Sequence, residues 1–201
     1  MGIRIIRKKA ELASDRMRAA LYYARKRRLN RLAGGSSGGG APIPGGDEQT
    51  LSQGTSAFST SNWSMKGNIF LVNNDRVLTK VSTDSSTGRI LELVVFETDS
   101  SYIVTDVIQD GVDSTDTSVS EEITLTTPIL LEVGKYYGIA MRSSDFSGVP
   151  MGYDLNPQSD ANFTWERMVR NNLDASFDVG VNPTVSNEDS WVVNLTTEAV
   201  G

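Results

Sequence analysis

The sequence predicts a mainly β protein: a jelly-roll-like antiparallel β-sandwich preceded by a long basic N-terminal α-helix and a Gly/Ser-rich linker. Three observations support this prediction. Residues 1–33 carry eleven Lys/Arg against two Asp/Glu (net charge +9), whereas residues 34–201 carry eight against 23 (net charge −15). Residues 34–46 are Gly, Ser, Pro and Ala with a single Ile. From about residue 56, short runs rich in Val, Ile, Thr and aromatic residues alternate with Gly, Asn, Asp and Ser, which is typical of an all-β sandwich.

The basic arm, residues 1–33, has the composition of a helix. Residues 5–33 hold no Pro and no Gly, and helix-favouring Ala, Leu, Arg and Lys dominate. Small apolar side chains recur every three or four residues, and a cluster of cations follows at the end, where the helix dipole favours them. The residues expected to dock against a partner are Ile6, Ala10, Ala13, Met17, Ala20, Leu21, Ala24, Arg25, Arg27 and Arg28.

Two functions stay open for this arm. It is either a docking helix, inserted into a partner protein or bundled with its own copies, or a nucleic-acid arm whose cations neutralise phosphates. The apolar stripe favours docking, because phosphate binding alone does not require one. The linker, residues 34–46, cannot form a core and predicts a flexible tether with a typical span of ~20 Å.

The acidic domain, residues 47–201, contains the predicted strands. They cover residues 57–63, 68–72, 76–82, 89–97, 102–108, 121–127, 135–142, 162–168 and 191–197. Their number and length suit a jelly roll of two four-stranded sheets with room for one extra strand. A short helix at 166–173 is the one helical alternative in this part of the chain.

One stretch resembles a known class of domains. The run RILELVVFETDSSYIV, followed by ITLTTPILLEVGKYYGIAM, is similar to the sandwich modules of carbohydrate-binding and phage surface proteins, in which a long β-pair precedes the pattern L-x-x-G-x-x-Y. The layout of anchoring arm, Gly/Ser tether and displayed β-domain also resembles tailed-phage virion structural proteins. Small jelly-roll coat proteins with Arg-rich arms share the same order.

A loop at residues 143–157 is the candidate binding surface. It places aromatic side chains beside carboxylates, the combination that a sugar-binding surface needs, although aromatics that cap the end of a sandwich give the same pattern. The candidate ligand-binding residues are Phe146, Tyr153, Asp145 and Asp154. Asp106, Asp110, Asp113 and Asp116 form a second acidic stretch, which we interpret as a solvated turn rather than a Ca²⁺ site.

Composition excludes most enzyme chemistry. The chain has no Cys and no His, so thiolate catalysis, Ser-His-Asp triads and imidazole metal sites are impossible. We expect no catalytic residues, no metal and no cofactor. No apolar run reaches the ~18–20 residues that a membrane span requires, so no membrane partner is expected.

These observations predict a non-enzymatic structural protein located in a virion: a capsid, neck or tail decoration or fibre. Its helix docks to other virion proteins (capsid, portal or tail), and its β-domain is displayed outward, with a host glycan as a candidate ligand. A homo-oligomer is expected, since strand edges must be covered. The first alternative is a coat subunit whose arm binds packaged nucleic acid. The second is a carbohydrate-binding module.

Overall fold

The computed structural model describes residues 42–55, 57–59, 63–84, 90–114, 121–143, 148–171, 177–187 and 189–201. These belong to one compact unit that begins at Pro42. The basic arm and its ten predicted docking residues lie outside the described residues, as do Asp145 and Phe146. Within the described residues no helix is long and apolar enough to cross a membrane.

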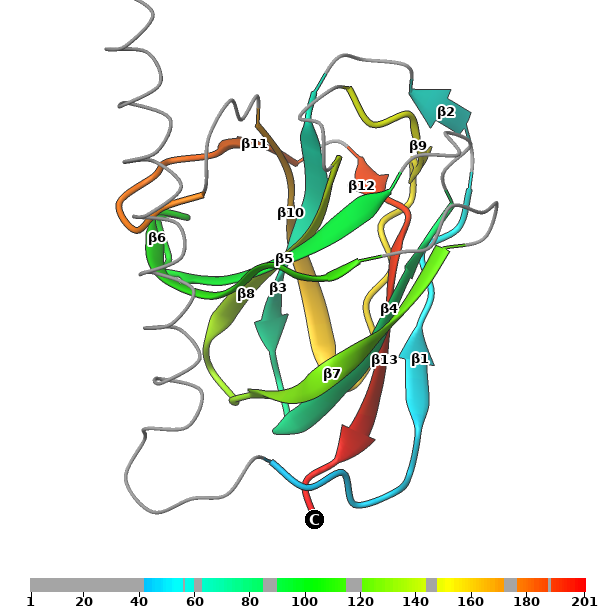
Figure 1. Ribbon diagram of the computed structural model, residues 1–201, viewed down its shortest axis with the longest axis vertical. Helices are drawn as coiled ribbons and strands as arrows, with labels where there is room; N and C mark the ends of the chain where they lie inside the picture. Colours follow the sequence, from blue (N-terminus) through cyan, green and yellow to red (C-terminus); the bar gives the residue numbers. More distant parts are fainter. Residues whose placement is uncertain are drawn as a thin grey trace, which may run out of the picture. The chain divides into compact units, whose positions relative to one another are not determined.

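The described unit is built from antiparallel sheets, which confirms the mainly β prediction (Figure 1). A four-stranded sheet has the order β1 (Gln49–Leu51), β13 (Val193–Ala199), β4 (Arg76–Thr83) and β7 (Glu121–Leu131). A six-stranded sheet has the order β11 (Thr184–Ser186), β10 (Phe163–Asn171), β3 (Met65–Val72), β8 (Tyr136–Ser143), β5 (Leu91–Thr98) and β6 (Val104–Ser114). A small third sheet joins β12 (Ser190–Trp191), β9 (Met151–Asp154) and β2 (Ala57–Ser59).

The sequence located the long strands and the short β2, which falls within the predicted strand 57–63, but it missed the short strands β1, β9 and β11. The helix considered for residues 166–173 is wrong, because β10 runs through to Asn171 and pairs with β3 along its whole length. The loop predicted at 143–157 contains β9, whose Met-Gly-Tyr-Asp sequence carries little β propensity but pairs on both sides. The larger sheet has six strands rather than four, since β10 and the short β11 extend it beyond β3.

The main hydrophobic core lies between the two large sheets. Leu78, Ile123 and Leu195 from the four-stranded sheet pack in one buried cluster with Phe70 and Ile139 from the six-stranded sheet. Alternation along each strand directs these side chains inward, and a bulge between Leu78 and Lys80 of β4 shifts it so that Leu78 and Val81 both reach this core. The two large sheets therefore bury their inner apolar faces against each other.

The six-stranded sheet also carries a second core on its outer face. Val94, Phe96 and Val169 point away from the first core, and Phe177 covers them from the segment that leads to β11. Phe96 packs directly over Gly138 of β8: a Cβ atom there would lie 2.0 Å from the Phe96 ring. Burial on both faces explains why β5 reads as a continuous apolar run.

Two residues of the acidic stretch, Asp110 and Asp113, are not in the solvated turn that we expected, whereas Asp106 is exposed and Asp116 lies outside the described residues. Asp110 and Asp113 lie in β6, which continues to Ser114. Asp110 forms an ion pair with the buried Arg142 of β8. Asp113 is buried and accepts hydrogen bonds from the backbone N and the Oγ1 of Thr126 in β7, so its carboxylate joins the two large sheets. These carboxylates stabilise the edge of the fold.

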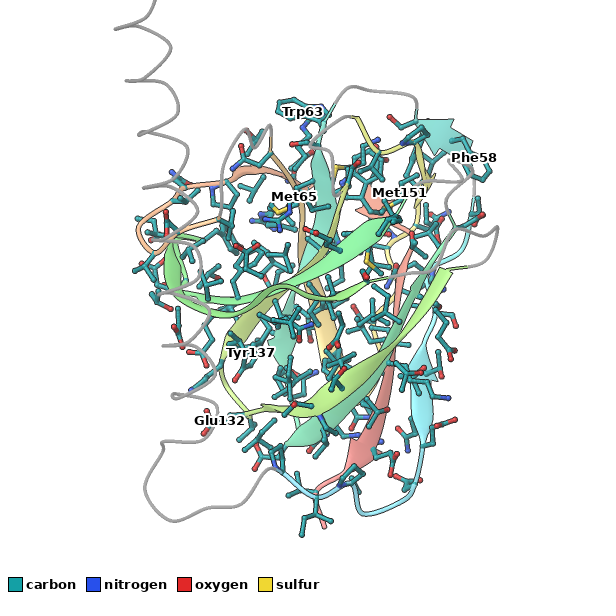
Figure 2. The ribbon with its side chains drawn as sticks, in the orientation of Figure 1. Phe58, Trp63, Met65, Glu132, Tyr137 and Met151 are labelled. Atoms are coloured by element: carbon teal, nitrogen blue, oxygen red, sulfur yellow. The ribbon has the colours of Figure 1, made fainter. Side chains whose placement is uncertain are left out.

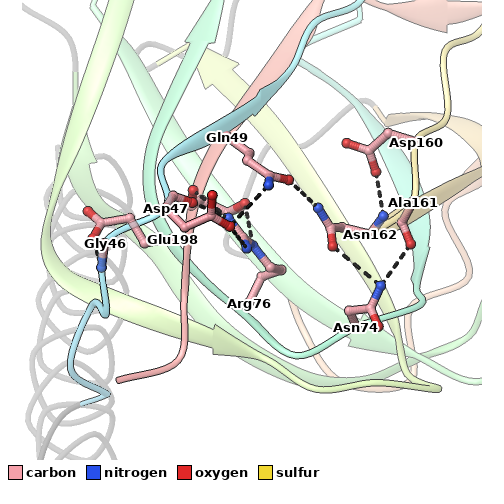
Figure 3. A network of polar contacts seen from close by, with 10 residues as sticks. Gly46, Asp47, Gln49, Asn74, Arg76, Asp160, Ala161, Asn162 and Glu198 are labelled. Atoms are coloured by element: carbon pink, nitrogen blue, oxygen red, sulfur yellow. Dashed lines mark hydrogen bonds and ion pairs between the residues drawn. The ribbon is translucent and has the colours of Figure 1, made fainter.

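A polar network holds the start of the unit against its C-terminal strand (Figure 3). Buried Arg76 of β4 donates hydrogen bonds to the Asp47 carboxylate (3.1 Å), to the Asp47 carbonyl (2.7 Å) and to the Thr197 carbonyl (3.0 Å). Residues 43–46, which we had assigned to the linker, also hydrogen-bond to residues 198–201. The chain therefore enters the β-domain beside its C-terminus.

Candidate functional site

A pocket of about 240 Å³ opens where the third sheet lies beside strand β10 of the six-stranded sheet. We call it the end pocket. Its lining residues come from four strands and the segment before β12: Phe58, Ser59, Tyr153, Met168, Arg170, Asp189 and Trp191. Figure 2 shows Phe58, which is 50% exposed, at the upper end of the molecule, the end that also carries Trp63.

Two cations face each other across the strands beside this pocket. Lys66 of β3 lies directly opposite Arg170 of β10 in the sheet register, and alternation places both on the inner face with Asn68 and Met168. Lys66 is fully buried. Like charges directly opposite on neighbouring strands repel, so this arrangement costs free energy. We call Lys66 and Arg170 the cation pair.

Neither cation forms an ion pair with an acidic side chain among the described residues. Among the described residues, every ion pair joins other side chains. The Lys66 ammonium lies 4.4 Å from the centroid of the Trp191 ring and donates a hydrogen bond to the Ser59 carbonyl at 3.3 Å. The Arg170 guanidinium lies 5.1 Å from the Trp63 ring, and its buried Nε has no hydrogen-bond partner among the described residues.

Burial, followed by the charge of Arg170, lowers the pKa of Lys66 from 10.5 to about 8. Below that pH the ammonium is charged in a region of low polarity, where a charge acts on its surroundings more strongly than it does in water. At neutral pH the end pocket therefore has two cations, Arg170 in its lining and Lys66 beside it, against one lining carboxylate, Asp189. This excess of positive charge favours an anionic ligand over a neutral or cationic one.

Buried polar groups fix the aromatic wall. The Asn68 side chain donates to the Trp191 carbonyl (2.7 Å) and accepts from its backbone N (3.0 Å), while the Trp191 indole donates to the Val169 carbonyl (3.1 Å). Tyr153 packs edge-on against Trp191, with ring centroids 6.2 Å apart. Because these bonds are internal, the wall is formed before any ligand arrives.

The structure separates the residues that the sequence grouped. Of the four candidates, Tyr153 lines the end pocket. Asp154 points elsewhere: it is buried, and its carboxylate accepts hydrogen bonds from the backbone N of Gly54 and of Asn156. Sequence analysis missed Lys66, Arg170 and Asp189. The available signal was Lys66 and Asn68 in alternate positions of a strand that is otherwise largely apolar.

No metal centre is formed by the described residues: they contain no group of three or more His, Cys, Asp or Glu placed to hold an ion. The lining of the end pocket combines aromatic residues, the Arg170 guanidinium and the Asp189 carboxylate. This combination can orient a ligand.

The end pocket and the entry of the tether lie at opposite ends of the β-domain (Figure 1). Strand β13 connects them, since Val193 follows the pocket residue Trp191 closely and Ala199 hydrogen-bonds to Gly45. Seven strand residues span ~20 Å. A partner that holds the chain by the segment before Pro42 would leave the pocket at the far end.

No family model matches the chain, and no curated protein sequence matches it. Among solved structures, a clostridial cysteine protease, Cwp84 after propeptide cleavage, is similar with a TM-score of 0.52 and 13% identity, covering 76% of this chain and 40% of that chain. A second structure holds the cysteine protease and lectin-like domains of Cwp84, a surface layer associated protein of Clostridium difficile, with a TM-score of 0.46 and 13% identity over 76% and 36% of the two chains. This chain therefore spans less than half of either structure, and the likeness to the first concerns the fold alone.

Proposed function

We propose that this chain is a non-enzymatic structural protein of a virus particle, attached through a helix in residues 1–33 and displaying its β-domain outward. The proposal rests on one observation: the tether enters the β-domain at one end, and the end pocket lies at the other end (Figure 1). A particle that holds the basic arm projects the pocket toward the surroundings, and the tether supplies the reach. Many copies on one particle would add avidity to a weak ligand interaction.

The strand order supports a jelly roll for the displayed domain. Along the chain β1, β3, β4 and β5 alternate between the two large sheets, β6 pairs with β5 in the larger sheet, and β7 and β8 again lie in the smaller and the larger sheet. The first strand lies beside the last in the four-stranded sheet. Interleaved Greek keys produce this nesting, which viral capsid domains and lectin domains share. Strands β10 and β11 extend the larger sheet beyond that plan.

The charge distribution also supports an anchoring role for the arm and a display role for the β-domain. The arm, with a net charge of +9, suits an acidic protein partner in the capsid, neck or tail, and the remaining net charge of −15 keeps displayed copies soluble and mutually repelled. The absence of Cys and His from the chain supports a non-enzymatic role.

Immunogold electron microscopy tests this function. Antibodies raised against residues 42–201 should label intact virus particles from the source culture, and particles that carry the gene without residues 1–33 should lose the label. Labelling that appears only after the particles are disrupted would contradict outward display. Closed shells formed by the purified chain alone would favour the coat-subunit alternative, as would binding of the arm to nucleic acid that weakens steeply with salt.

A carbohydrate-binding module is the second candidate, and the end pocket is the observation that favours it. Aromatic side chains beside polar groups in a preformed pocket are the usual means of orienting a small ligand. The two candidates are compatible, because a displayed module can bind a host glycan.

A further inference from the structure

The end pocket has two cations, Lys66 beside it and Arg170 in its lining, against the single Asp189 carboxylate. Lys66 is fully buried and sits directly opposite Arg170, and no described carboxylate pairs with either cation. A buried cation without an acidic partner, beside a second cation, destabilises the fold. An anion in the pocket would reduce that repulsion, and the free energy released would contribute to binding.

The geometry of Arg170 favours a planar anion. Its guanidinium carries a fork of N–H donors that fits both oxygens of a carboxylate, and its buried Nε has no acceptor among the described residues. Lys66 lies behind the lining, next to Trp191 and Ser59, so it acts through its charge rather than by direct contact. The low polarity around it weakens the screening of that charge.

The other lining residues indicate a sugar ring. Tyr153 supplies an aromatic ring on the same face of the third sheet as Trp191, and the Asp189 carboxylate is an acceptor for hydroxyl groups. A simple anion would make no use of the aromatic side chains, and an uncharged sugar would leave the cation pair unpaired. The volume of about 240 Å³ is below the ~300–1,000 Å³ of pockets that enclose larger ligands, so it suits one ring.

We propose that the end pocket binds a single sugar residue that carries a carboxylate, at the end or on a branch of a glycan. Arg170 holds the carboxylate, Lys66 attracts it from behind the wall, Tyr153 packs against the ring, and Asp189 accepts from its hydroxyls. This inference deepens the display function proposed above, because it names what the outward end recognises. It does not depend on the identity of the anchoring partner.

Isothermal titration calorimetry on the purified full chain tests the inference, with methyl β-glucuronoside and N-acetylneuraminic acid as the two sources of an acidic ring. Methyl β-glucoside and sodium acetate are the controls for charge and for the ring. At least one acidic sugar should bind at least about tenfold more tightly than the glucoside and than acetate. Equal affinity for the glucoside, equal affinity for acetate, or no heat from either acidic sugar would overturn the proposal.

Variants on one strand supply the matched control. Arg170→Met should weaken acidic-sugar binding at least about tenfold, and Arg170→Lys, which keeps the charge without the fork, should weaken it less. Arg167 lies on the same strand, but its guanidinium packs over the Tyr102 ring, 5.0 Å away, outside the pocket lining. Arg167→Met should change affinity less than about twofold. Equal losses from Arg167→Met and Arg170→Met would overturn the assignment of the carboxylate to Arg170.

The charge of Lys66 provides an independent readout. Arg170, Asp189 and Tyr153 are the charged and titratable groups among the described residues that line the pocket beside it. Affinity for the acidic sugar should fall between pH 7 and pH 9 as the ammonium loses its proton, since its pKa is lowered to about 8. In Lys66→Met this fall should disappear. An unchanged pH profile in that variant would overturn the electrostatic role of Lys66. These titrations use the purified chain, so sugar binding can be confirmed even if immunogold labelling shows no display on particles. Display can equally be confirmed if no acidic sugar binds.

Discussion

Replacing Lys66 with Met should stabilise the protein, although it removes contacts. Lowering a pKa from 10.5 to about 8 corresponds to about 3 kcal/mol of penalty for the charged form at neutral pH. Met fills a similar volume and removes this penalty. It also loses the interaction with the Trp191 ring, which is worth about 2 kcal/mol when desolvated, and gains about 1 kcal/mol from a sulfur–aromatic contact. The expected net gain is about 1–2 kcal/mol, or a Tm higher by about 2–8 °C.

The pH dependence of the free energy of unfolding shows whether the charged Lys66 destabilises the fold. Between pH 8 and 10.5 the unfolded chain keeps a proton on Lys66 that the folded chain has lost, so the wild-type free energy of unfolding should rise with pH by up to about 1.4 kcal/mol per unit. Lys66→Met should lack this rise. Burial raises the pKa of Tyr137, which lowers stability at still higher pH, but this happens in both proteins and cancels in the difference.

Urea denaturation followed by far-UV circular dichroism at pH 7, 8, 9 and 10 measures both quantities. Lys80→Met is the control, because Lys80 is partly exposed and lies 3.8 Å from Glu48 and 3.9 Å from Glu122; its loss should change stability by less than about 1 kcal/mol. A Lys66→Met protein that is less stable than wild type by more than about 1 kcal/mol, or that keeps the wild-type slope with pH, would refute the reasoning.

Three further substitutions test the fold around the site by the same urea assay. Gly138→Ala should destabilise by about 3 kcal/mol or more, because the new Cβ would meet the Phe96 ring at 2.0 Å; a loss below about 1 kcal/mol would mean that the ring moves freely. Asp113→Asn should cost about 1–3 kcal/mol, because an NH₂ group would face the donors of Gln109 and Thr126, whereas Asp106→Asn on the exposed side of β6 should have little effect. Arg76→Met should cost about 2–4 kcal/mol and speed amide hydrogen exchange at residues 43–50; unchanged exchange there would show that the network in Figure 3 does not hold the tether entry.

The end pocket illustrates why the site was harder to predict than the strands. A strand such as β5 depends on its own sequence, since β-branched and apolar residues in a run favour extended backbone wherever they pack. The sequence predicted that Tyr153 and Asp154 both bind a ligand. Tyr153 lines the end pocket, whereas the Asp154 side chain lies on the opposite side of the strand and accepts hydrogen bonds from backbone N–H groups. One residue of register decides which side chain reaches the site.

Local pattern alone determined the mainly β character of residues 47–201 and the ranges of most long strands, because alternation and turn residues act over neighbouring positions. It also determined the charge division between arm and β-domain, which is a property of composition. Only tertiary structure decided that Lys66 and Arg170, 104 positions apart in the sequence, meet across β3 and β10, because long-range pairing depends on how whole sheets register. The same packing set the end pocket far from the tether entry, since β13 runs from one to the other before the chain ends.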